Sequence, residues 1–439
     1  MRTSALIKKY DQPVPRYTSY PTAVHFNHDI SQQYYQKLLT DLETQEPVSL
    51  YVHIPFCHVL CHYCGCHTRV VNSYSPVEFY VQTMLKEIDL VGEKLSYKLL
   101  VSQLHFGGGS PNFLKEEDFQ RILEKLSQYF DINDQTEMAI ETDPRLLDEA
   151  KIKTLAKLGF KRVSLGVQDF NPEVQKAVNR IQPFEKVKKA VENLRDVGIN
   201  KINFDLMIGL PLQTLDIIKD NVEKALSLKP NRFAVFAYAH VPWMKKHQKL
   251  LEKHSFPDTG LRFSMMESVK QAMKKAKYHS IGIDHFARED DSLYLSYKNN
   301  KLRRNFQGYT DDSAKTVLGF GLSSISAFEG AYVQNLTDAP EYRKAIESGN
   351  FPIKKGRILN EDDKVRRNLI AQIMCGYKVD IEQYSIEQQG LVGLQQDGLI
   401  AMDGTTLQIM EEGWPFARIA ASQFDTYHKQ QENQHARAI

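Results

Sequence analysis

The sequence predicts an α/β fold with parallel strands and one active-site face. Six short apolar, β-branched segments alternate with helical segments, which is the pattern of repeated strand–helix–strand units. Glycines and polar side chains follow several of these strands directly, and four of the five cysteines lie in one stretch of ten residues, 57–66, shortly after the first strand. These observations favour a barrel or a doubly wound sheet with its chemistry at the carboxyl ends of the strands.

The chain divides into three predicted parts. The first 46 residues are polar and carry three prolines between residues 13 and 21, which exclude regular secondary structure and predict an extended arm. Residues 47–355 follow as the catalytic domain, and residues 356–439 as a smaller C-terminal domain.

The strands and helices of the catalytic domain are predicted in order from residue 48. Residues 48–54 form the first strand and lead into the cysteines, and Ser75 to Glu78 match a capping box that opens a helix. The other strands are predicted at residues 100–106, 137–141, 162–167, 201–208 and 232–237. The later helices are predicted at residues 146–158, at residues 187–197 and after Thr214, and the first two end at Gly159 and Gly198.

Polar groups stand where these strands end. A glycine run at residues 107–109 follows the second strand, and Glu141, Gln168 and Asp205 follow or close later ones. A single carboxylate at a strand end is more often a helix cap or a surface ion pair than a ligand. Because parallel strands end at the same edge, we nevertheless expect one active-site face to collect these residues.

The C-terminal domain is predicted to be winged-helix-like and mainly helical. A helix is predicted at residues 362–375, a hairpin at residues 399–409 around Asp403-Gly404, and a further helix from Trp414. Residues 361–439 carry 7 basic and 12 acidic residues, which argues against DNA binding. We expect this domain to pack against the site or cover it.

Composition excludes several partners. The formal net charge of +2 gives no electrostatic case for nucleic acid or anionic lipid. No segment has the eighteen or so apolar residues of a membrane helix, and the first ten residues have no apolar signal core. We therefore expect a cytoplasmic protein with no nucleic-acid and no membrane partner.

The clustered cysteines predict a metal centre. Cys57, Cys61 and Cys64 lie in one short loop, and Cys66 follows closely. Three thiolates from such a loop can hold a [4Fe–4S] cluster and leave one iron open to a chelating small molecule. The alternative is structural zinc with a nearby histidine as fourth ligand, but the second ligand arm that such sites use is missing from the sequence. The spacing favours the iron–sulfur cluster.

These motifs resemble those of the radical S-adenosylmethionine (SAM) family. The spacing of Cys57, Cys61 and Cys64, with the aromatic Tyr63 before the third cysteine, is similar to that family's cluster loop. Residues 106–111, FGGGSP, are similar to its amine-binding glycine motif. The resemblance implies a partial (β/α)6 barrel, one [4Fe–4S] cluster and SAM bound through its amine and carboxylate at the open iron.

One subgroup matches over most of the chain, from about residue 13 to beyond residue 330. The matching segments are PRYTSYPT at 15–22, YVHIPFC at 51–57, Cys66, GVQDF at 166–170, GLP at 209–211, YAH at 238–240, DHFAR at 284–288 and NFQGYT at 305–310. These segments resemble the oxygen-independent coproporphyrinogen III oxidases. The last eighty residues match least, with a loose similarity at residues 424–427.

The resemblance implies a role for each matching residue. Cys57, Cys61 and Cys64 would hold the cluster, and Cys66 would serve catalysis without being a ligand. The residues implied for the cluster-bound SAM are Tyr51, Tyr63, Gly108, Glu141 and Ile325. The residues implied for a second SAM in the same active site are Gly109, Ser110, Gln168, Arg180, Asp205 and Ala239.

The implied reaction is the conversion of coproporphyrinogen III to protoporphyrinogen IX without oxygen, in haem biosynthesis. Two propionate side chains lose carbon dioxide and become vinyl groups, after a 5′-deoxyadenosyl radical has removed hydrogen from the β-carbon. The arm would cover the substrate, and Arg16, Arg180 and Arg288 are candidates for binding its carboxylates. A one-electron donor such as flavodoxin or ferredoxin, an unidentified electron acceptor and a monomeric state complete the expectations.

An alternative within the same superfamily is a haem-binding chaperone without decarboxylase activity. Such relatives typically lack the segment from Arg16 to Thr22 and the Cys66 thiol, and both are present here. The sequence therefore favours the oxidase.

Overall fold

The fold is that of a computed structural model, and it is described for residues 2–43 and 46–428. Its centre consists of six parallel strands that lie side by side in chain order. They are β1 (Val48–Ile54), β4 (Leu99–Gly108), β6 (Glu137–Thr142), β7 (Arg162–Gln168), β8 (Lys201–Ile208) and β9 (Arg232–Ala237). All six predicted strands are confirmed.

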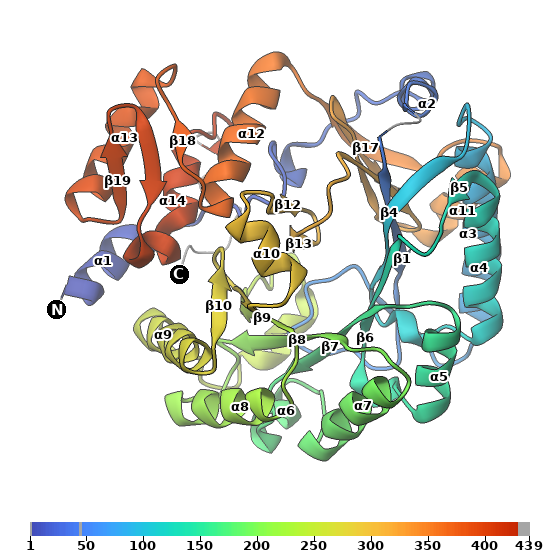
Figure 1. Ribbon diagram of the computed structural model, residues 1–439. Helices are drawn as coiled ribbons and strands as arrows, with labels where there is room; N and C mark the ends of the chain where they lie inside the picture. The colour runs from blue at the N-terminus through green and yellow to red at the C-terminus, as the bar shows by residue number, and fades with distance from the viewer. Residues whose placement is uncertain (1, 44–45, 429–439) are drawn as a thin grey trace.

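A layer of helices covers the outer face of these curved strands (Figure 1). They are α3 (Ser75–Gly92), α4 (Glu116–Tyr129), α5 (Glu149–Lys157), α6 (Pro172–Ala177), α7 (Phe184–Asp196), α8 (Leu215–Ser227) and α9 (Thr259–Lys275). Each joins one parallel strand to the next or closes the series, as right-handed crossovers require.

The alternation of residues along β8 illustrates how the strands divide core from cavity. Ile202, Phe204 and Leu206 are buried in the core under the helices, whereas Asn203 and Asp205 line the interior cavity. Successive side chains of a strand point to opposite faces, so the apolar–polar alternation alone orients this strand.

The barrel is partial because further strands extend both of its edges, all of them paired antiparallel except β14, which pairs in parallel with β1. Beyond β1 come β14 (Thr316–Phe320), β15 (Ile325–Ala327), β16 (Ala331–Asn335) and β17 (Ile353–Ile358). Beyond β9 come β11 (His285–Arg288) and β10 (Tyr278–Ile281). The sheet therefore ends in two edges and does not close, in agreement with the predicted partial barrel.

Smaller elements complete the catalytic region. They are β2 (Phe56–Cys57), β3 (Arg69–Val70), β5 (Phe130–Asp131), α10 (Ser292–Lys298), β12 (Arg303–Asn305), β13 (Gly308–Thr310) and α11 (Ala339–Glu347). The strands β2 and β3 pair at the base of the cysteine loop.

The arm is only partly extended. The expectation that its prolines exclude regular structure was wrong at both ends, because helix α1 (Arg2–Tyr10) precedes the prolines and α2 (Gln32–Thr40) follows them. Ser31 caps α2 by accepting a hydrogen bond from the amide of Tyr34. Only the stretch between the two helices is mostly extended, with one short 3₁₀ turn.

The C-terminal region combines helices with a small sheet. Its elements are α12 (Glu361–Cys375), β18 (Val379–Asp380), α13 (Ser385–Gln396), β19 (Ile400–Asp403), β20 (Thr406–Ile409) and α14 (Ala417–Ser422). The predicted hairpin around Asp403-Gly404 is confirmed. The helix expected from Trp414 starts at Ala417, because a 3₁₀ turn with Pro415 inside it comes first. Residues 429–439 of the predicted domain lie outside the described residues.

The arm and the C-terminal region share one hydrophobic core. Tyr10, Val14, Tyr17 and Tyr20 are buried among side chains of the C-terminal elements. In Figure 1 the blue helix α1 accordingly lies beside the red elements β19 and α14. The boundaries at residues 46 and 355 stay a prediction, but the core shows that the two ends of the chain fold together.

Two further predicted helix starts differ from the structure. The capping box at Ser75 does not form, because Tyr74 is the N-cap and makes no side-chain cap bond. Helix α5 begins at Glu149, capped by Asp148, after a short 3₁₀ turn.

Among the described residues, no helix combines the length and the hydropathy that crossing a membrane would need.

Candidate active site

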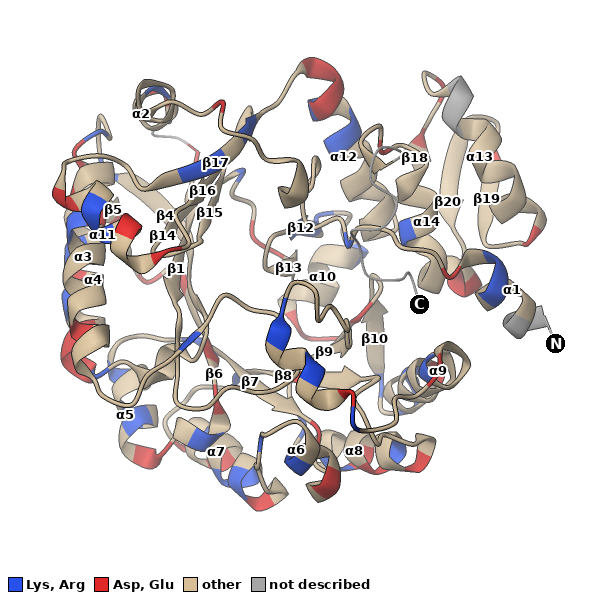
Figure 2. Cartoon of the chain, turned by 180° about the vertical axis from the view of Figure 1, so that it is seen from behind, with Lys and Arg blue, Asp and Glu red and all other residues tan. Residues whose placement is uncertain are grey.

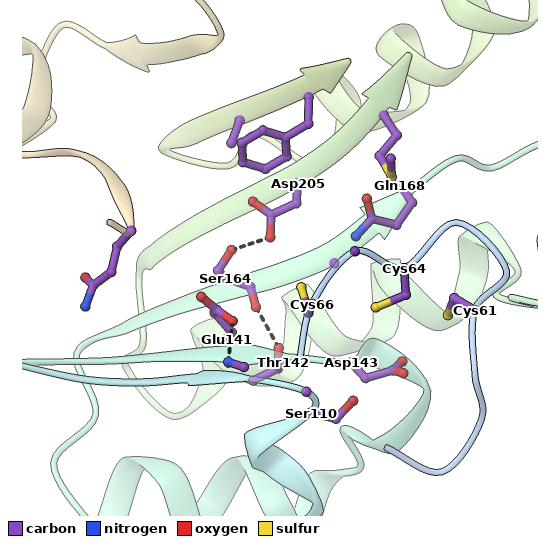
Figure 3. Close-up of a pocket in the computed structure, with 18 of the residues that line it drawn as sticks. Cys61, Cys64, Cys66, Ser110, Glu141, Thr142, Asp143, Ser164, Gln168 and Asp205 are labelled. Atoms are coloured by element: carbon purple, nitrogen blue, oxygen red, sulfur yellow. Dashed lines mark hydrogen bonds between the residues drawn. The ribbon is translucent and has the colours of Figure 1, made fainter. Parts of the chain in front are cut away.

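A cavity of about 530 Å³ lies inside the barrel, at the carboxyl ends of the parallel strands. Figure 3 shows cysteines from the loop after β1 facing acidic and amide side chains from the strand ends. The predicted site residues that line it are Cys57, Cys61, Tyr63, Cys64, Cys66, Gly108, Gly109, Ser110, Glu141, Gln168, Arg180, Asp205 and Ala239. Topology therefore brings together groups that are almost two hundred residues apart.

Backbone hydrogen bonds anchor the cysteine loop on both sides. The amides of Gly109 and Ser110 donate to the carbonyls of Ile54 and Phe56, both at 2.8 Å. At the far end the amide of His62 donates to the carbonyl of Val178 at 2.9 Å. The loop is thus fixed to the glycine run and to the turn after α6.

Two arginines approach the sulfur of Cys61. Arg180 Nη1 lies 3.5 Å and Arg145 Nη2 3.9 Å from this Sγ. Both guanidinium groups also bind Asp143, with Nη–Oδ2 distances of 3.3 and 2.6 Å. One carboxylate therefore holds both guanidinium groups against the cysteine loop. On the other side of the loop, Ser110 Oγ donates to Cys57 Sγ at 3.7 Å.

The thiols of the cysteine loop differ in acidity. Burial raises the pKa of Cys57 to about 12. The thiol of Cys66 donates a hydrogen bond to Cys64, which lowers the pKa of Cys64 to about 6 and raises the pKa of Cys66. A bound metal would deprotonate its thiol ligands outright, so these values describe the loop without metal.

The glycine run leaves no room for side chains. A Cβ on Gly109 would lie 2.7 Å from the carbonyl oxygen of Phe56. Gly108 has φ +113°, and a Cβ there would lie 2.5 Å from the ring of His53. Glycine at both positions therefore lets the backbone after β4 pass directly beside the cysteine loop.

Glu141 presents an ionised carboxylate at the end of β6. Although burial works in the opposite direction, hydrogen bonds from His105 and from the amide of Gly108 lower its pKa. The corresponding distances are 3.2 Å to His105 Nε2 and 3.1 Å to the Gly108 nitrogen. The carboxylate can accept hydrogen bonds from ligand hydroxyl or amine groups in the cavity.

Asp205 lies further along the strand ends and is less acidic. Burial raises its pKa to about 6, against hydrogen bonds from Ser164 at 2.9 Å and Asn203 at 2.8 Å. Figure 3 shows Asp205 bonded to Ser164, with Gln168 beyond them at the end of β7. Gln168 has φ +65° and follows an irregularity in the β7–β8 register.

Two predicted site residues lie outside the cavity lining. Tyr51 is stacked on His105, with ring centroids 6.0 Å apart, and would be 2.8 Å from a Cβ on Gly107. It therefore packs behind Glu141 and the glycine run. Ile325 starts β15, two strands from β1, and does not border the cavity.

The three arginine candidates for the substrate carboxylates occupy different places. Arg16 lines the cavity and binds Asp284 at 3.1 Å. Arg180 is committed to Asp143 and to the carbonyl of Gly166. Arg288 pairs with Asp290 on the surface and does not line the cavity. Of the three, the geometry favours Arg16.

The sequence analysis did not identify Arg145, which donates to Cys61, or Asp143, which binds Arg145 and Arg180. Asp143 and Arg145 follow β6 directly, and Asp143 is only two residues after Glu141. Because residues two apart in a strand share a face, Asp143 could have been added to the prediction from spacing alone. His105, which binds Glu141, lies on β4 and could have been found in the same way.

The residues present fit an iron–sulfur cluster with an open iron. Three thiols from one loop border a cavity, two guanidinium groups donate to the sulfur of Cys61, and the glycine run leaves room beside them. Within the described part of the chain, no three His, Cys, Asp or Glu side chains already stand close enough to hold one metal ion.

Comparison with known proteins gives the family. The family model of the Radical SAM superfamily matches residues 51–225. Oxygen-independent coproporphyrinogen III oxidase from Bradyrhizobium diazoefficiens is 38% identical over 450 residues, covering 100% of both chains. The enzyme of that name from Helicobacter pylori (strain 26695) is 37% identical and covers 95% of both chains.

A solved structure is also similar over nearly the whole chain. Coproporphyrinogen III oxidase from Escherichia coli, a radical SAM enzyme, has a TM-score of 0.90 and is 34% identical, covering 97% of this chain and 98% of its own. The fold and the cysteine loop thus define a radical SAM enzyme. Within that class, the chain belongs to the oxygen-independent coproporphyrinogen III oxidases.

This membership confirms the predicted class of activity and cofactors. The protein is an oxidoreductase of haem biosynthesis that acts on coproporphyrinogen III and uses SAM with a [4Fe–4S] cluster. Of the two metal alternatives, the iron–sulfur cluster is therefore confirmed. The roles of individual side chains are taken up below.

Proposed function

We propose that the cavity at the strand ends is where this enzyme decarboxylates two propionates of coproporphyrinogen III to give protoporphyrinogen IX. The observation that carries the proposal is the shared cavity: three thiols of one loop face Glu141 and Asp205 across it. When bound, the cluster and SAM supply a 5′-deoxyadenosyl radical that removes hydrogen from a propionate side chain.

Cys57, Cys61 and Cys64 hold the cluster in this proposal. Arg180 and Arg145 position the sulfur of Cys61 by donating to it, and Asp143 orients both guanidinium groups. Cys66 serves catalysis without binding iron, and its hydrogen bond to Cys64 favours the thiolate of that ligand.

Two SAM molecules are proposed to share the cavity. Glu141 and Gly108 bind the first, next to Tyr63 of the cysteine loop. Tyr51 supports this position from behind, and Ile325 is proposed for the same SAM although it lies outside the cavity lining. The residues proposed for the second SAM are Gly109, Ser110, Gln168, Arg180, Asp205 and Ala239.

The arm is proposed to cover the substrate. Arg16 brings a guanidinium group to the cavity, and Arg304 holds the arm there by donating to the carbonyls of Arg16 and Tyr17. A guanidinium group binds carboxylates strongly, and the substrate carries four of them. The arm also excludes water from the reacting groups.

The remaining partners are proposals of the same kind. We infer a monomeric, cytoplasmic enzyme that takes single electrons from a carrier such as flavodoxin or ferredoxin. An unidentified acceptor takes the electrons that the substrate loses. All five cysteines are free thiols, which is typical of a reducing compartment.

Anaerobic reconstitution with iron and sulfide tests the proposal. The purified protein should absorb at about 400 nm and, with SAM, dithionite and coproporphyrinogen, form protoporphyrinogen, which is detected by fluorescence after oxidation. Cys61→Ser should lose both the absorbance and the product. A reconstituted protein that binds haem stoichiometrically but forms no product would overturn the proposal in favour of the chaperone.

A further inference from the structure

One segment of the chain, residues 240–254 between β9 and α9, lies directly on the cysteine loop. Lys245 Nζ donates to the carbonyl of Cys66 and His247 Nε2 to the carbonyl of Cys64, both at 2.8 Å. The buried Gln248 donates to the carbonyl of Tyr63 at 3.0 Å. Three neighbouring side chains therefore hold this segment against the cysteine loop. Residues 240–254 are called here the β9–α9 segment.

The outward side of the β9–α9 segment exposes large apolar side chains. Trp243 and Met244 are each 63% exposed, and Leu250 is 51% exposed. Scattered single apolar residues are common on protein surfaces, but tryptophan and methionine together are enriched where proteins bind one another. The fold gives these three side chains no intramolecular reason to be apolar.

Lysines lie next to these apolar side chains along the segment. The segment contains Lys245, Lys246, Lys249 and Lys253, and its single acidic residue, Glu252, is bonded to His240 at 3.3 Å. In Figure 2 the chain between β9 and α9 faces the viewer and carries more blue than red. An apolar centre with a cationic rim is complementary to a partner with an acidic rim.

We propose that the β9–α9 segment is the docking surface for a small acidic electron-carrier protein that holds a flavin or an iron–sulfur group. The proposal rests on the proposed function, because the cluster must receive an electron. In each encounter the carrier loses one electron and the cluster gains one, with no bond made or broken and no proton transferred. A carrier seated on Trp243 would be two residues from Lys245, which is bonded to the cysteine loop itself.

Binding of a purified flavodoxin to the reconstituted holoenzyme tests the proposal. We expect K246E/K249E to weaken binding at least about tenfold at low salt, because charge reversal removes steering and complementarity. Trp243→Ala should weaken binding without changing its salt dependence. The control K186E/K189E reverses two lysines that are also exposed, on α7 of the outer helical layer, and should bind as the wild type does.

Stopped-flow bleaching of the cluster absorbance gives a second readout. With reduced flavodoxin, K246E/K249E should reduce its cluster at least about tenfold more slowly than the wild type. With dithionite, which needs no protein surface, the two should be reduced equally fast. Failure of the wild type to form product with dithionite would count against the proposed function, whereas the flavodoxin binding data decide the docking surface by themselves.

Two outcomes would overturn the proposal. One is K246E/K249E binding flavodoxin and accepting its electron as the wild type does. The other is self-association of the wild type in sedimentation that Trp243→Ala abolishes, which would assign the surface to a second copy of the chain.

Discussion

Two buried carboxylates, one in the cavity and one on the helical side of the sheet, are held in different ionisation states. In the cavity, Asp143 binds the guanidinium groups of Arg180 and Arg145. On the other side, Glu87 of α3 is 1% exposed and accepts hydrogen bonds from Tyr342 Oη at 2.5 Å, from the Gly321 amide at 2.7 Å and from the side chain of Asn335.

The difference lies in the charge of the donors. Burial acts against ionisation in both places, yet the pKa of Asp143 is lowered because Arg180 and Arg145 are cations. Around Glu87 burial outweighs the neutral donors and raises the pKa to about 7. Neutral hydrogen bonds can orient a buried carboxyl group, but a cation keeps it ionised. The cavity is therefore built to hold charge, whereas the Glu87 network joins α3 to β16 and to the turn after β14.

Removing the cation should have the largest effect. Arg180→Met takes a donor from Cys61 and a charge from the buried Asp143, so we expect the free energy of unfolding to fall by about 3 kcal/mol. Iron content after reconstitution should fall below about a tenth of the wild-type value, as measured by metal analysis. Arg180→Lys keeps the charge and should recover part of the iron. Full iron content in the Met variant would show that Arg180 does not support the cluster loop.

Removing the buried acid beside α3 should destabilise the fold without touching the cavity. Glu87→Ala takes the acceptor from Tyr342 Oη and from the Gly321 amide, and we expect a loss of about 2–3 kcal/mol in urea denaturation. Iron per folded molecule should stay at the wild-type value. Loss of iron together with normal stability would contradict the separation of the two regions.

The ionisation state of Glu87 predicts a pH dependence. Its pKa is near 4.5 when unfolded and about 7 when folded, so the folded protein binds the proton more tightly. Its contribution to stability is complete below pH 4.5 and is lost as the pH rises through 7. Relative to Glu87→Gln, the wild type should gain at most about 1.4 kcal/mol per pH unit between pH 7 and 5. A difference that is constant with pH would contradict the raised pKa.

Asp205 gives a second comparison with Asp143 inside the cavity, because its hydrogen-bond donors are the neutral side chains of Ser164 and Asn203. Its pKa of about 6 means that it ionises as the pH rises through 6. If its carboxylate binds the second SAM, kcat/KM should rise through pH 6 in the wild type. Asp205→Asn should lower kcat/KM about tenfold, as expected for losing a hydrogen bond to a charged group, and remove this step. An unaltered profile would remove Asp205 from the site.

The sequence predicted the parallel half of the sheet far better than its extensions. The strands of the central series are short apolar runs between helical segments, so each could be found from its own residues. The extension β14–β17 was missed because its short strands are defined by pairing with one another, for instance Gln334 with Lys355. Helix α1 was missed because its burial depends on contacts with the other end of the chain.

The candidate site divides in the same way. The cysteine loop and the glycine run are contiguous motifs, and their spacing indicated the cluster and SAM directly. Arg16 could not be distinguished from Arg288 in the sequence, because both are arginines in matching segments. Only the path of the arm brings Arg16 to the cavity while Arg288 pairs with Asp290 on the surface.

What the sequence determined by itself was therefore local: the order of the strands, three thiols in one loop, and glycines where the backbone passes beside them. The tertiary structure decided which distant charges meet those thiols, since Arg180 is 119 residues from Cys61 and Lys245 is 179 residues from Cys66. The reason is physical. Spacing along the chain controls only near neighbours, whereas burial and the meeting of strand ends decide which charged groups share a cavity and which of them stay ionised.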